Sequence, residues 1–261
     1  MTFCLAMRVE DGLVGIADTR VISGSETITA KKVAVFTQGE RPLFLMTSGL
    51  RSLRDKTLTY FRDALAELDE PKARLYHVVN LFADQMRRAS AEDRGSLEAS
   101  GLSLNLHVLM GGQLADDEEH KLYLIYPEAN WVEIGPGTPY HIIGASGYGK
   151  PVLDRTLKFT DTLKLALKVG CLAFDSTRIS AADVDFPVDV IVYRRGTGDL
   201  IEHRYEKREL AAMSDWWQDR LRASARDLPT DALDRLLDPQ TGAPGSPAAA
   251  VPAPVAFEPS P

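Results

Sequence analysis

Apolar and polar positions alternate with a period of two along much of the first fifty residues, a pattern typical of half-buried strands. Residues 1–8 and 13–18 show it on either side of a turn at Gly12, and together they predict a hairpin. In the first strand, odd-numbered residues share one face and even-numbered residues share the other. The segments 31–36 and 41–49 repeat the pattern, and we expect them to continue the same meander.

The hydrophobic period changes to that of amphipathic helices after residue 50. Apolar residues recur at this spacing over 53–68 and 75–86, with Pro71 between the two predicted helices. One or two further helices are predicted over 152–172, and a last one starts near Ser214, its candidate N-cap. The remaining strands are predicted at 102–112, 120–127, 131–135, 139–147, 188–195 and 199–206.

This order separates runs of strands from runs of helices, which favours a layered α+β domain over a parallel βαβ fold. We predict a main domain over residues 1–206 and a helical extension over 207–238. The last segment, 239–261, has 7 prolines in 23 residues and little to bury, so it is predicted to be disordered.

The composition is ordinary for a soluble protein, with 44% hydrophobic and 26% charged residues among 261. The net charge of −7 disfavours general binding to nucleic acids or anionic membranes, and no apolar run approaches the roughly 20 residues of a membrane span. Because no basic segment followed by a long apolar one opens the chain, we expect a cytoplasmic protein. Cys4 and Cys171 lie in apolar segments and are predicted to be buried, reduced thiols.

Thr2 directly follows the initiator methionine, so removal of Met1 would place its hydroxyl beside a free α-amino group. Such an amine has a reference pKa of about 8 and can act as a base near neutral pH without a histidine. Many proteins begin with Met-Thr, so the pair alone predicts little. Its significance depends on the motifs downstream.

Five segments resemble, in the same order, the β-type subunits of the proteasome and, more closely, the bacterial proteasome-related peptidases called Anbu. They are MTFCLAMRVEDGLVGIADTR, KKV, MTSGL, GASGYGKP and CLAFDSTR. The resemblance runs from Thr2 to about Arg195 and is weaker beyond. It implies a four-layer αββα sandwich of the N-terminal nucleophile hydrolase type, which is compatible with the predicted order of elements. It also implies a homo-oligomeric ring or open ring-like assembly and no organic cofactor, and it leaves any dedicated unfoldase partner unknown.

The resemblance further implies a threonine-type peptidase in which Thr2 is the nucleophile and its own amine is the base. Asp18, at the end of the second predicted strand, would hold the catalytic lysine. Lys32 would be that lysine, and its charge would favour the neutral amine. Lys31 is the rival, because this segment is about one residue shorter than the family pattern. Gly49 would direct its backbone N–H at the oxyanion.

A second group of residues is implied farther along the chain. Ser146 would hydrogen-bond the amine of the nucleophile, with Gly147 as its supporting neighbour in a tight turn. Asp175, in the segment FDST, matches the second acidic residue of the family's site. Ser176, which follows it, is a supporting candidate.

One position departs from the family pattern. Three residues after the second acid, the family has a small hydroxyl residue followed by glycine, whereas this chain has Arg178 and Ile179. The missing hydroxyl has three candidate replacements nearby, which are Ser176, Thr177 and Ser180.

Other chemistry is less well supported. GYGKP lacks the spacing of a phosphate loop, DDEEH is typical of a solvated hairpin tip, and no pair of histidines has zinc spacing. Two alternative functions stay open. One is an amidohydrolase acting on a specific small amide, and the other is a proteolytically silent ring that serves as a scaffold.

Overall fold

Three antiparallel sheets and five helices form a mixed α+β fold in the computed structural model, which describes residues 2–23 and 26–229. One five-stranded sheet contains, in spatial order, β10 (Tyr140–Gly144), β1 (Phe3–Val9), β2 (Gly12–Asp18), β11 (Val188–Arg194) and β12 (Leu200–Tyr205). The other contains β5 (Val33–Gln38), β6 (Arg41–Gly49), β7 (Leu106–Gly112), β8 (Lys121–Ile125) and β9 (Trp131–Glu133). The third is a two-stranded ribbon of β3 (Arg20–Ser23) and β4 (Glu26–Thr29). The helices are α1 (Arg51–Ala66), α2 (Leu75–Ala99), α3 (Lys150–Thr156), α4 (Leu163–Ser180) and α5 (Lys207–Arg226).

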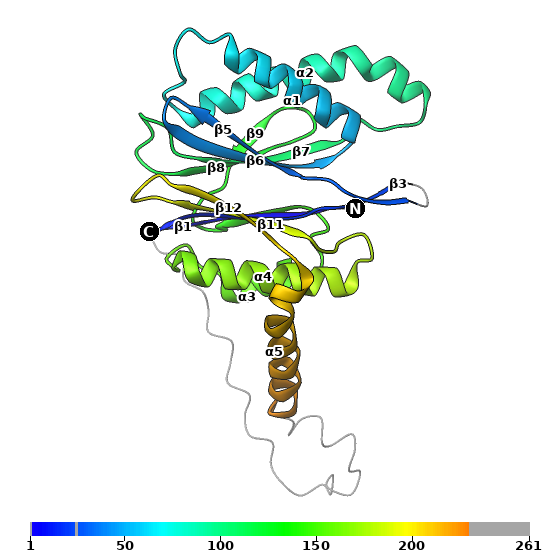
Figure 1. The fold of residues 1–261 in the computed structure, drawn as a ribbon, viewed down its shortest axis with the longest axis vertical. Helices are drawn as coiled ribbons and strands as arrows, with labels where there is room; N and C mark the ends of the chain where they lie inside the picture. The colour runs from blue at the N-terminus through cyan, green and yellow to red at the C-terminus, as the bar shows by residue number, and fades with distance from the viewer. Residues whose placement is uncertain (1, 24–25, 230–261) are drawn as a thin grey trace, which may run out of the picture. The chain divides into compact units, whose positions relative to one another are not determined.

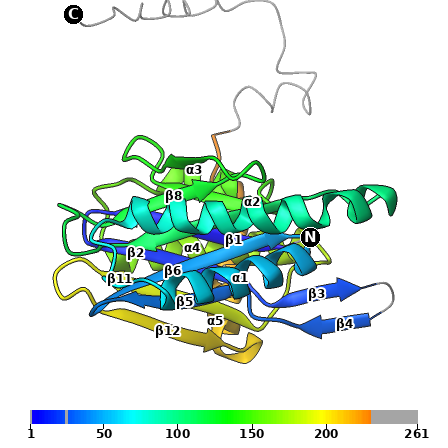
Figure 2. The same ribbon diagram turned by 90° about the horizontal axis from the view of Figure 1, so that it is seen from above.

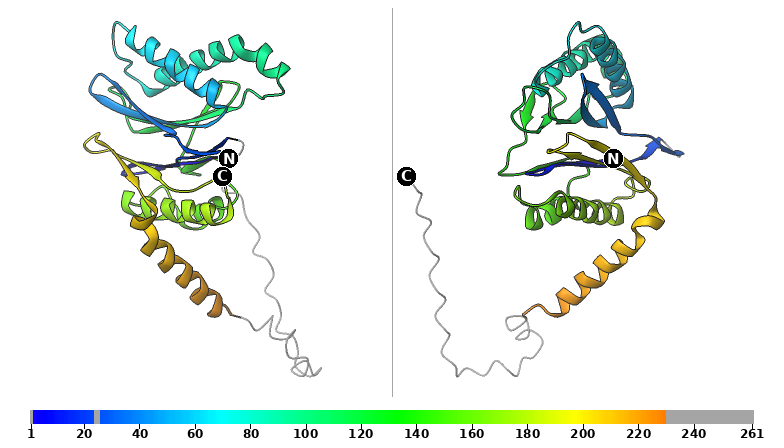
Figure 3. Two further views of the ribbon diagram at one scale, coloured as in Figure 1. Left: turned by 45° about the vertical axis from the view of Figure 1, so that its right-hand side comes forward. Right: turned by 60° about the vertical axis from the view of Figure 1, so that its left-hand side comes forward.

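The two large sheets face each other, and helices cover their outer faces. Helices α1 and α2 lie on the sheet that contains β6, and α3 and α4 lie on the sheet that contains β1 (Figure 1). Figure 2 looks onto α1 and α2 from above, and Figure 3 shows the same order of layers from two other directions. One hydrophobic cluster fills the space between the sheets, and two others fill the spaces between each sheet and its helices.

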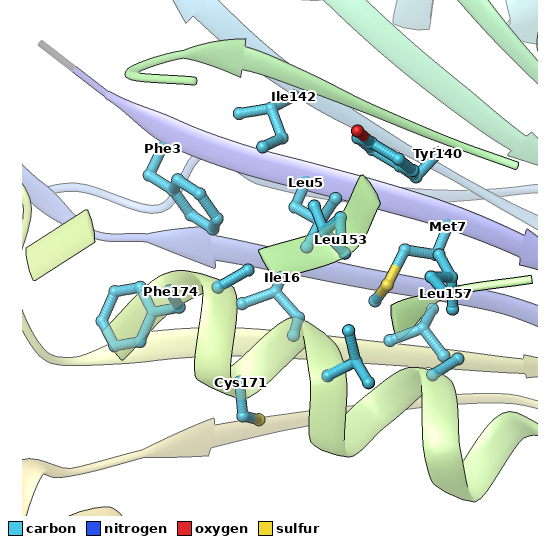
Figure 4. Packing of buried hydrophobic residues seen from close by; sticks show 14 of the residues in the cluster. Phe3, Leu5, Met7, Ile16, Tyr140, Ile142, Leu153, Leu157, Cys171 and Phe174 are labelled. Carbon is cyan, nitrogen blue, oxygen red and sulfur yellow. The ribbon is translucent and has the colours of Figure 1, made fainter. Parts of the chain in front are cut away.

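Strand β1 is buried on both faces along its whole length. Phe3, Leu5 and Met7 pack toward α4 (Figure 4), whereas Cys4 and Ala6 belong to the cluster between the sheets. The predicted division of this strand into odd and even faces is thus confirmed. Full burial of each large apolar side chain contributes roughly 1.5–3 kcal/mol, so the start of the chain is firmly anchored in the core.

The expected single meander is wrong. Strand β2 pairs with β1 and with β11 from far along the chain, whereas β5 and β6 begin the facing sheet. Alternation identifies a strand, but it does not say which of two facing sheets supplies its partner. The connecting ribbon of β3 and β4 extends from the end of the molecule at which β1 begins (Figures 1 and 2). The sequence analysis missed this ribbon, because the side chains of β4 are largely exposed.

Two predicted boundaries are also wrong. The strand predicted over 102–112 begins at Leu106, because Leu102 is 48% exposed and Asn105 O accepts the Leu50 N–H at 2.7 Å. The last helix begins at Lys207, so Ser214 is an interior residue of α5 and not its N-cap. Its side chain is buried and hydrogen-bonds to a residue of α4, described below.

The pattern over 152–172 corresponds to two helices, α3 and α4, and the Thr162 hydroxyl caps α4 by accepting the Leu165 N–H. Farther along, the chain divides into two compact units between Trp217 and Gln218. The boundary between main domain and helical extension at residues 206 and 207 stays a prediction. The segment predicted to be disordered, 239–261, lies outside the described residues.

Candidate active site

Asp18 ends β2 directly beside the start of β1. The antiparallel register that pairs Cys4 with Ala17 brings Phe3 to Asp18, and the Phe3 N–H donates to Oδ1 at 2.8 Å. The Arg20 N–H donates to Oδ2 at 3.2 Å. Because Asp18 is fully buried, these donors replace the water that its carboxylate loses on folding. The hairpin thus holds the Asp18 carboxylate against the backbone of Phe3, the residue that follows Thr2.

Lys32 approaches Asp18 from the facing sheet, just before β5. Its Nζ lies 2.6 Å from Asp18 Oδ1 and donates to Arg20 O at 2.8 Å, and its side chain is 3% exposed. The Thr47 N–H donates to Lys32 O at 3.0 Å, which fixes the backbone here. Burial raises the pKa of Asp18, and the Lys32 ammonium opposes that rise. A buried ion pair therefore joins the two sheets at this end of the molecule.

The neighbouring Lys31 lies elsewhere. Its Nζ is 2.5 Å from Glu202 Oε1 on β12, and its side chain is 47% exposed. Of the two rival lysines, the structure brings Lys32 to Asp18 and gives Lys31 a surface ion pair.

Two glycines allow close backbone contacts near Thr2. Gly49, the last residue of β6, has φ +139°, and a Cβ there would overlap the Asn105 carbonyl. Gly144, at the end of β10, has φ +93°, and a Cβ there would overlap the Thr2 carbonyl oxygen. Next to it, the Ala145 N–H donates to Thr2 O at 2.6 Å. Sequence reasoning missed Gly144, although a glycine closing an apolar strand run is a signal for close backbone approach.

A cavity of about 370 Å³ opens beside these residues. Among the predicted site residues, Thr2, Lys32 and Gly49 line it. Thr2 is half-buried there. The remaining lining residues are Arg20, Val21, Thr47, Ser48, Arg51, Arg54, Asn105 and Gly144. The three arginines are a further feature that the sequence analysis missed, because they come from β3 and α1 and are brought together only by folding.

The second predicted group lies outside this lining. Ser146 and Gly147 are exposed in the turn before α3, where Ser146 O accepts the Lys150 N–H at 3.0 Å. Asp175 is buried in α4, and Ser176 beside it is half-buried. In the part of the chain that the structure describes, no hydrogen bond joins the side chains of Ser146, Asp175 or Ser176 to Thr2.

Asp175 is part of a cluster with Arg178 and Ser214. Arg178 Nε donates to Asp175 Oδ1 at 2.8 Å, and Arg178 Nη2 donates to Ser214 Oγ at 3.0 Å. Ser214 Oγ in turn donates to Asp175 Oδ2 at 3.0 Å. The hydroxyl beside the second acid therefore comes from α5. Of the expected replacements, Thr177 is buried with its hydroxyl donating to Ala173 O at 2.8 Å.

Residues outside the site give little sign of other chemistry. No group of three or more His, Cys, Asp or Glu among residues 2–23 and 26–229 could hold a metal ion. Cys4 and Cys171 are both buried, and burial raises the pKa of each thiol, that of Cys171 to about 11. Asp117, in the acidic hairpin tip, accepts the Leu75 and Leu114 N–H groups at 3.0 Å each. The described helices include none that is both long and apolar enough for a membrane span.

Comparison with solved structures finds close relatives of the whole fold. The Gly-1 mutant of Anbu from Hyphomicrobium sp. strain MC1 is 30% identical with a TM-score of 0.79, over 87% of this chain and 99% of that one. Anbu from Pseudomonas aeruginosa, solved as a helical assembly of the Anbu complex, is 31% identical with a TM-score of 0.80, over 87% and 97%. Anbu from Yersinia bercovieri, described as an ancestral beta-subunit, is 27% identical with a TM-score of 0.78, over 87% and 98%.

Neither a protein-family model nor a curated protein matches the chain. The Hyphomicrobium and P. aeruginosa proteins identify the family, because each is at least 30% identical to this chain and is matched over nearly its whole length. The fold, the order of its elements and these relatives agree, and the chain belongs to the Anbu family of proteasome-like β-subunits.

Proposed function

We propose that the protein is a threonine-type hydrolase that cleaves peptide or amide bonds with Thr2 as nucleophile once Met1 has been removed. The observation that carries this proposal is the Lys32 ammonium, held 2.6 Å from buried Asp18 and lining the same cavity as Thr2. A fixed positive charge at that point favours a neutral amine at a freed N-terminus. The layers of helices and sheets support assignment to the four-layer αββα sandwich of the N-terminal nucleophile hydrolases.

The proposed reaction begins when the neutral amine of Thr2 takes the proton from its own hydroxyl. The oxygen attacks the carbonyl carbon of the substrate, and the Gly49 N–H stabilises the oxyanion that develops. The amine returns its proton to the leaving nitrogen, and the C–N bond breaks. The acyl group remains on Thr2 as an ester, which water activated by the same amine then hydrolyses.

The second predicted group has a supporting place in this proposal. Ser146 follows Ala145, whose N–H holds the Thr2 carbonyl at 2.6 Å, and its hydroxyl is predicted to reach the freed amine after Met1 is removed. Gly147 remains its predicted neighbour in the turn, and Ser176 remains a supporting candidate beside Asp175. Asp175, bonded to Arg178 and Ser214, is proposed to act through the position of α4.

We further propose that the protein assembles from copies of itself in the cytoplasm and needs no organic cofactor. The solved helical assembly of P. aeruginosa Anbu supports self-association. Such an assembly would shield sites that act on peptides.

An intact-mass spectrum combined with covalent labelling tests the nucleophile. We expect purified wild-type protein to lack Met1 and to form one adduct with a β-lactone or vinyl-sulfone probe at Thr2. Thr2→Ala should form none, while Thr2→Ser keeps a hydroxyl and should still be labelled. Retention of Met1 in the native protein, or equal labelling of Thr2→Ala, would overturn the proposal and favour the silent scaffold.

A further inference from the structure

The cavity beside Thr2 is lined by positive side chains. Arg20, Arg51 and Arg54 line it together with Lys32, and the described lining residues include no aspartate or glutamate. Val21 is the only aliphatic side chain among them. This combination is poorly suited to a large apolar group, because burying such a group there would separate charged side chains from water.

Carboxylates outside the cavity lining neutralise only part of the positive charge on the cavity wall. Lys32 is paired with Asp18, and Arg20 Nη1 lies 3.2 Å from Asp185 Oδ2. Among residues 2–23 and 26–229, Arg51 and Arg54 share a single acidic partner, Asp55. Because two guanidinium groups share one carboxylate, this wall carries an excess positive charge.

Several arginine donors remain available to a ligand. Arg51 Nε lies 3.5 Å from Asp55 Oδ2, too long for a good hydrogen bond, and its side chain is 57% exposed. A guanidinium presents five N–H donors in a fork that matches a carboxylate. An anionic group entering the cavity would satisfy the exposed Arg51 donors. Arg20 Nε is buried and has no hydrogen-bond partner among the described residues, so it adds positive charge to the wall rather than an open donor.

The dipole of helix α1 adds to the positive potential in the cavity. Helix α1 begins at Arg51, on the cavity wall, and its first turn contains no acidic residue to offset the positive end of the helix dipole. This contribution is secondary to the arginines, but it has the same sign.

We infer that this cavity selects an acidic side chain, so that the preferred substrate is a peptide with Asp or Glu immediately before the cleaved bond. The inference rests on the proposed function, because it takes the carbonyl next to that side chain to be the one that Thr2 attacks. Thr2, Gly49 and the arginines line the same cavity, so a carbonyl held between Thr2 and Gly49 would place the adjoining side chain in a cavity that the arginines line. Charge-assisted bonds to a carboxylate are about twice as strong as neutral ones.

The first test compares four peptide amides that differ only in the residue before the cleaved bond, namely Glu, Gln, Leu and Lys. We expect kcat/KM for the Glu peptide to exceed that for the Gln peptide by at least about tenfold, with Lys the poorest. The variant Arg51→Gln/Arg54→Gln should reduce the Glu-to-Gln ratio to about twofold or less. Asp55, left unpaired in that variant, is exposed, so the fold should persist, which a thermal melt checks.

Arg62→Gln is the matched control. Arg62 lies on α1 eight residues beyond Arg54 and does not line this cavity, and its change removes one positive charge, as each of the two changes in the double variant does. Its Glu-to-Gln ratio should equal that of wild type. Equal kcat/KM for the Glu and Gln peptides in wild type would overturn the inference. So would a loss of the Glu preference in Arg62→Gln as large as that in the double variant.

A binding measurement separates this inference from the proposed function. Labelled peptides ending in Glu or Gln are titrated against Thr2→Ala protein, which can make no acyl ester, and fluorescence anisotropy reports binding. Tighter binding of the Glu peptide, lost with the added changes Arg51→Gln and Arg54→Gln, supports the acidic preference even if no substrate is hydrolysed. Hydrolysis without any preference for Glu would reject the acidic preference but not Thr2 as nucleophile. Undetectable binding of both peptides would likewise reject the acidic preference and leave the nucleophile proposal standing.

Discussion

Two of the ion pairs among the described residues, Asp18–Lys32 and Asp175–Arg178, have a buried carboxylate and differ in what else they touch. Asp18 and Lys32 join the two sheets, and their remaining partners are backbone groups of Phe3 and Arg20. Asp175 and Arg178 lie one turn apart on α4. In the Lys32 pair the cation borders a cavity beside Thr2, whereas in the Arg178 pair it bonds to Ser214 and lies 5.3 Å from the centre of the Phe186 ring.

This difference shows that burial and charge alone do not identify a catalytic group. Both carboxylates are at most 2% exposed, and both have a cation within 2.6 Å. The Lys32 pair keeps one member at a solvent-accessible wall next to a hydroxyl, and the Arg178 pair uses its hydrogen-bonding capacity to connect two helices. We therefore expect changes at the two pairs to separate activity from stability.

The largest effect is expected at Lys32. Lys32→Ala should lower kcat/KM by about 10²–10⁴-fold, because it removes the charge that keeps the base neutral. It should also destabilise the fold by about 3–5 kcal/mol, since Asp18 is left buried and unpaired. Peptide turnover and urea unfolding measure the two effects.

Two variants separate chemistry from folding. Asp18→Asn/Lys32→Met removes both charges, so it should recover most of the stability without recovering turnover. Lys31→Ala, which breaks only a surface ion pair, should change stability by no more than about 0.5 kcal/mol and leave turnover intact. Normal turnover in Lys32→Ala together with a loss of turnover in Lys31→Ala would show that Lys31, and not Lys32, is the catalytic lysine.

The sequence could predict the Lys32 pair more fully than the Arg178 pair. Asp18 ends a strand whose alternation is clear, and the register of a short hairpin places it near Thr2. Lys32 lies in the facing sheet, so its contact with Asp18 depends on the family resemblance rather than on periodicity. Ser214 contacts Asp175 from 39 residues away, and no local pattern relates α4 to α5. The cationic cavity wall was missed for the same reason.

A second expected effect tests how tightly the backbone holds Thr2. Gly144→Ala should lower kcat/KM by about 100-fold, because its Cβ would displace the Thr2 carbonyl and a shift of about 1 Å at a nucleophile can cost that much. Gly137→Ala is the control seven residues earlier, where an added Cβ meets nothing within 4 Å. Its turnover should stay within about twofold of wild type. Equal losses in the two variants would show that the contact between Gly144 and Thr2 does not account for the loss of activity.

The smallest effect on turnover is expected at the Arg178 pair. Arg178→Met should lower the free energy of unfolding by about 3–5 kcal/mol, because Asp175 stays buried without its cation. Adding Asp175→Asn removes the unpaired charge and should recover most of that loss, as urea unfolding would measure. If the cluster only positions α4 against α5, kcat/KM of the folded double variant should remain within about tenfold of wild type. A double variant that unfolds like wild type but is as inactive as Lys32→Ala would instead place Asp175 in the catalytic machinery, and the distinction between the two pairs would fail.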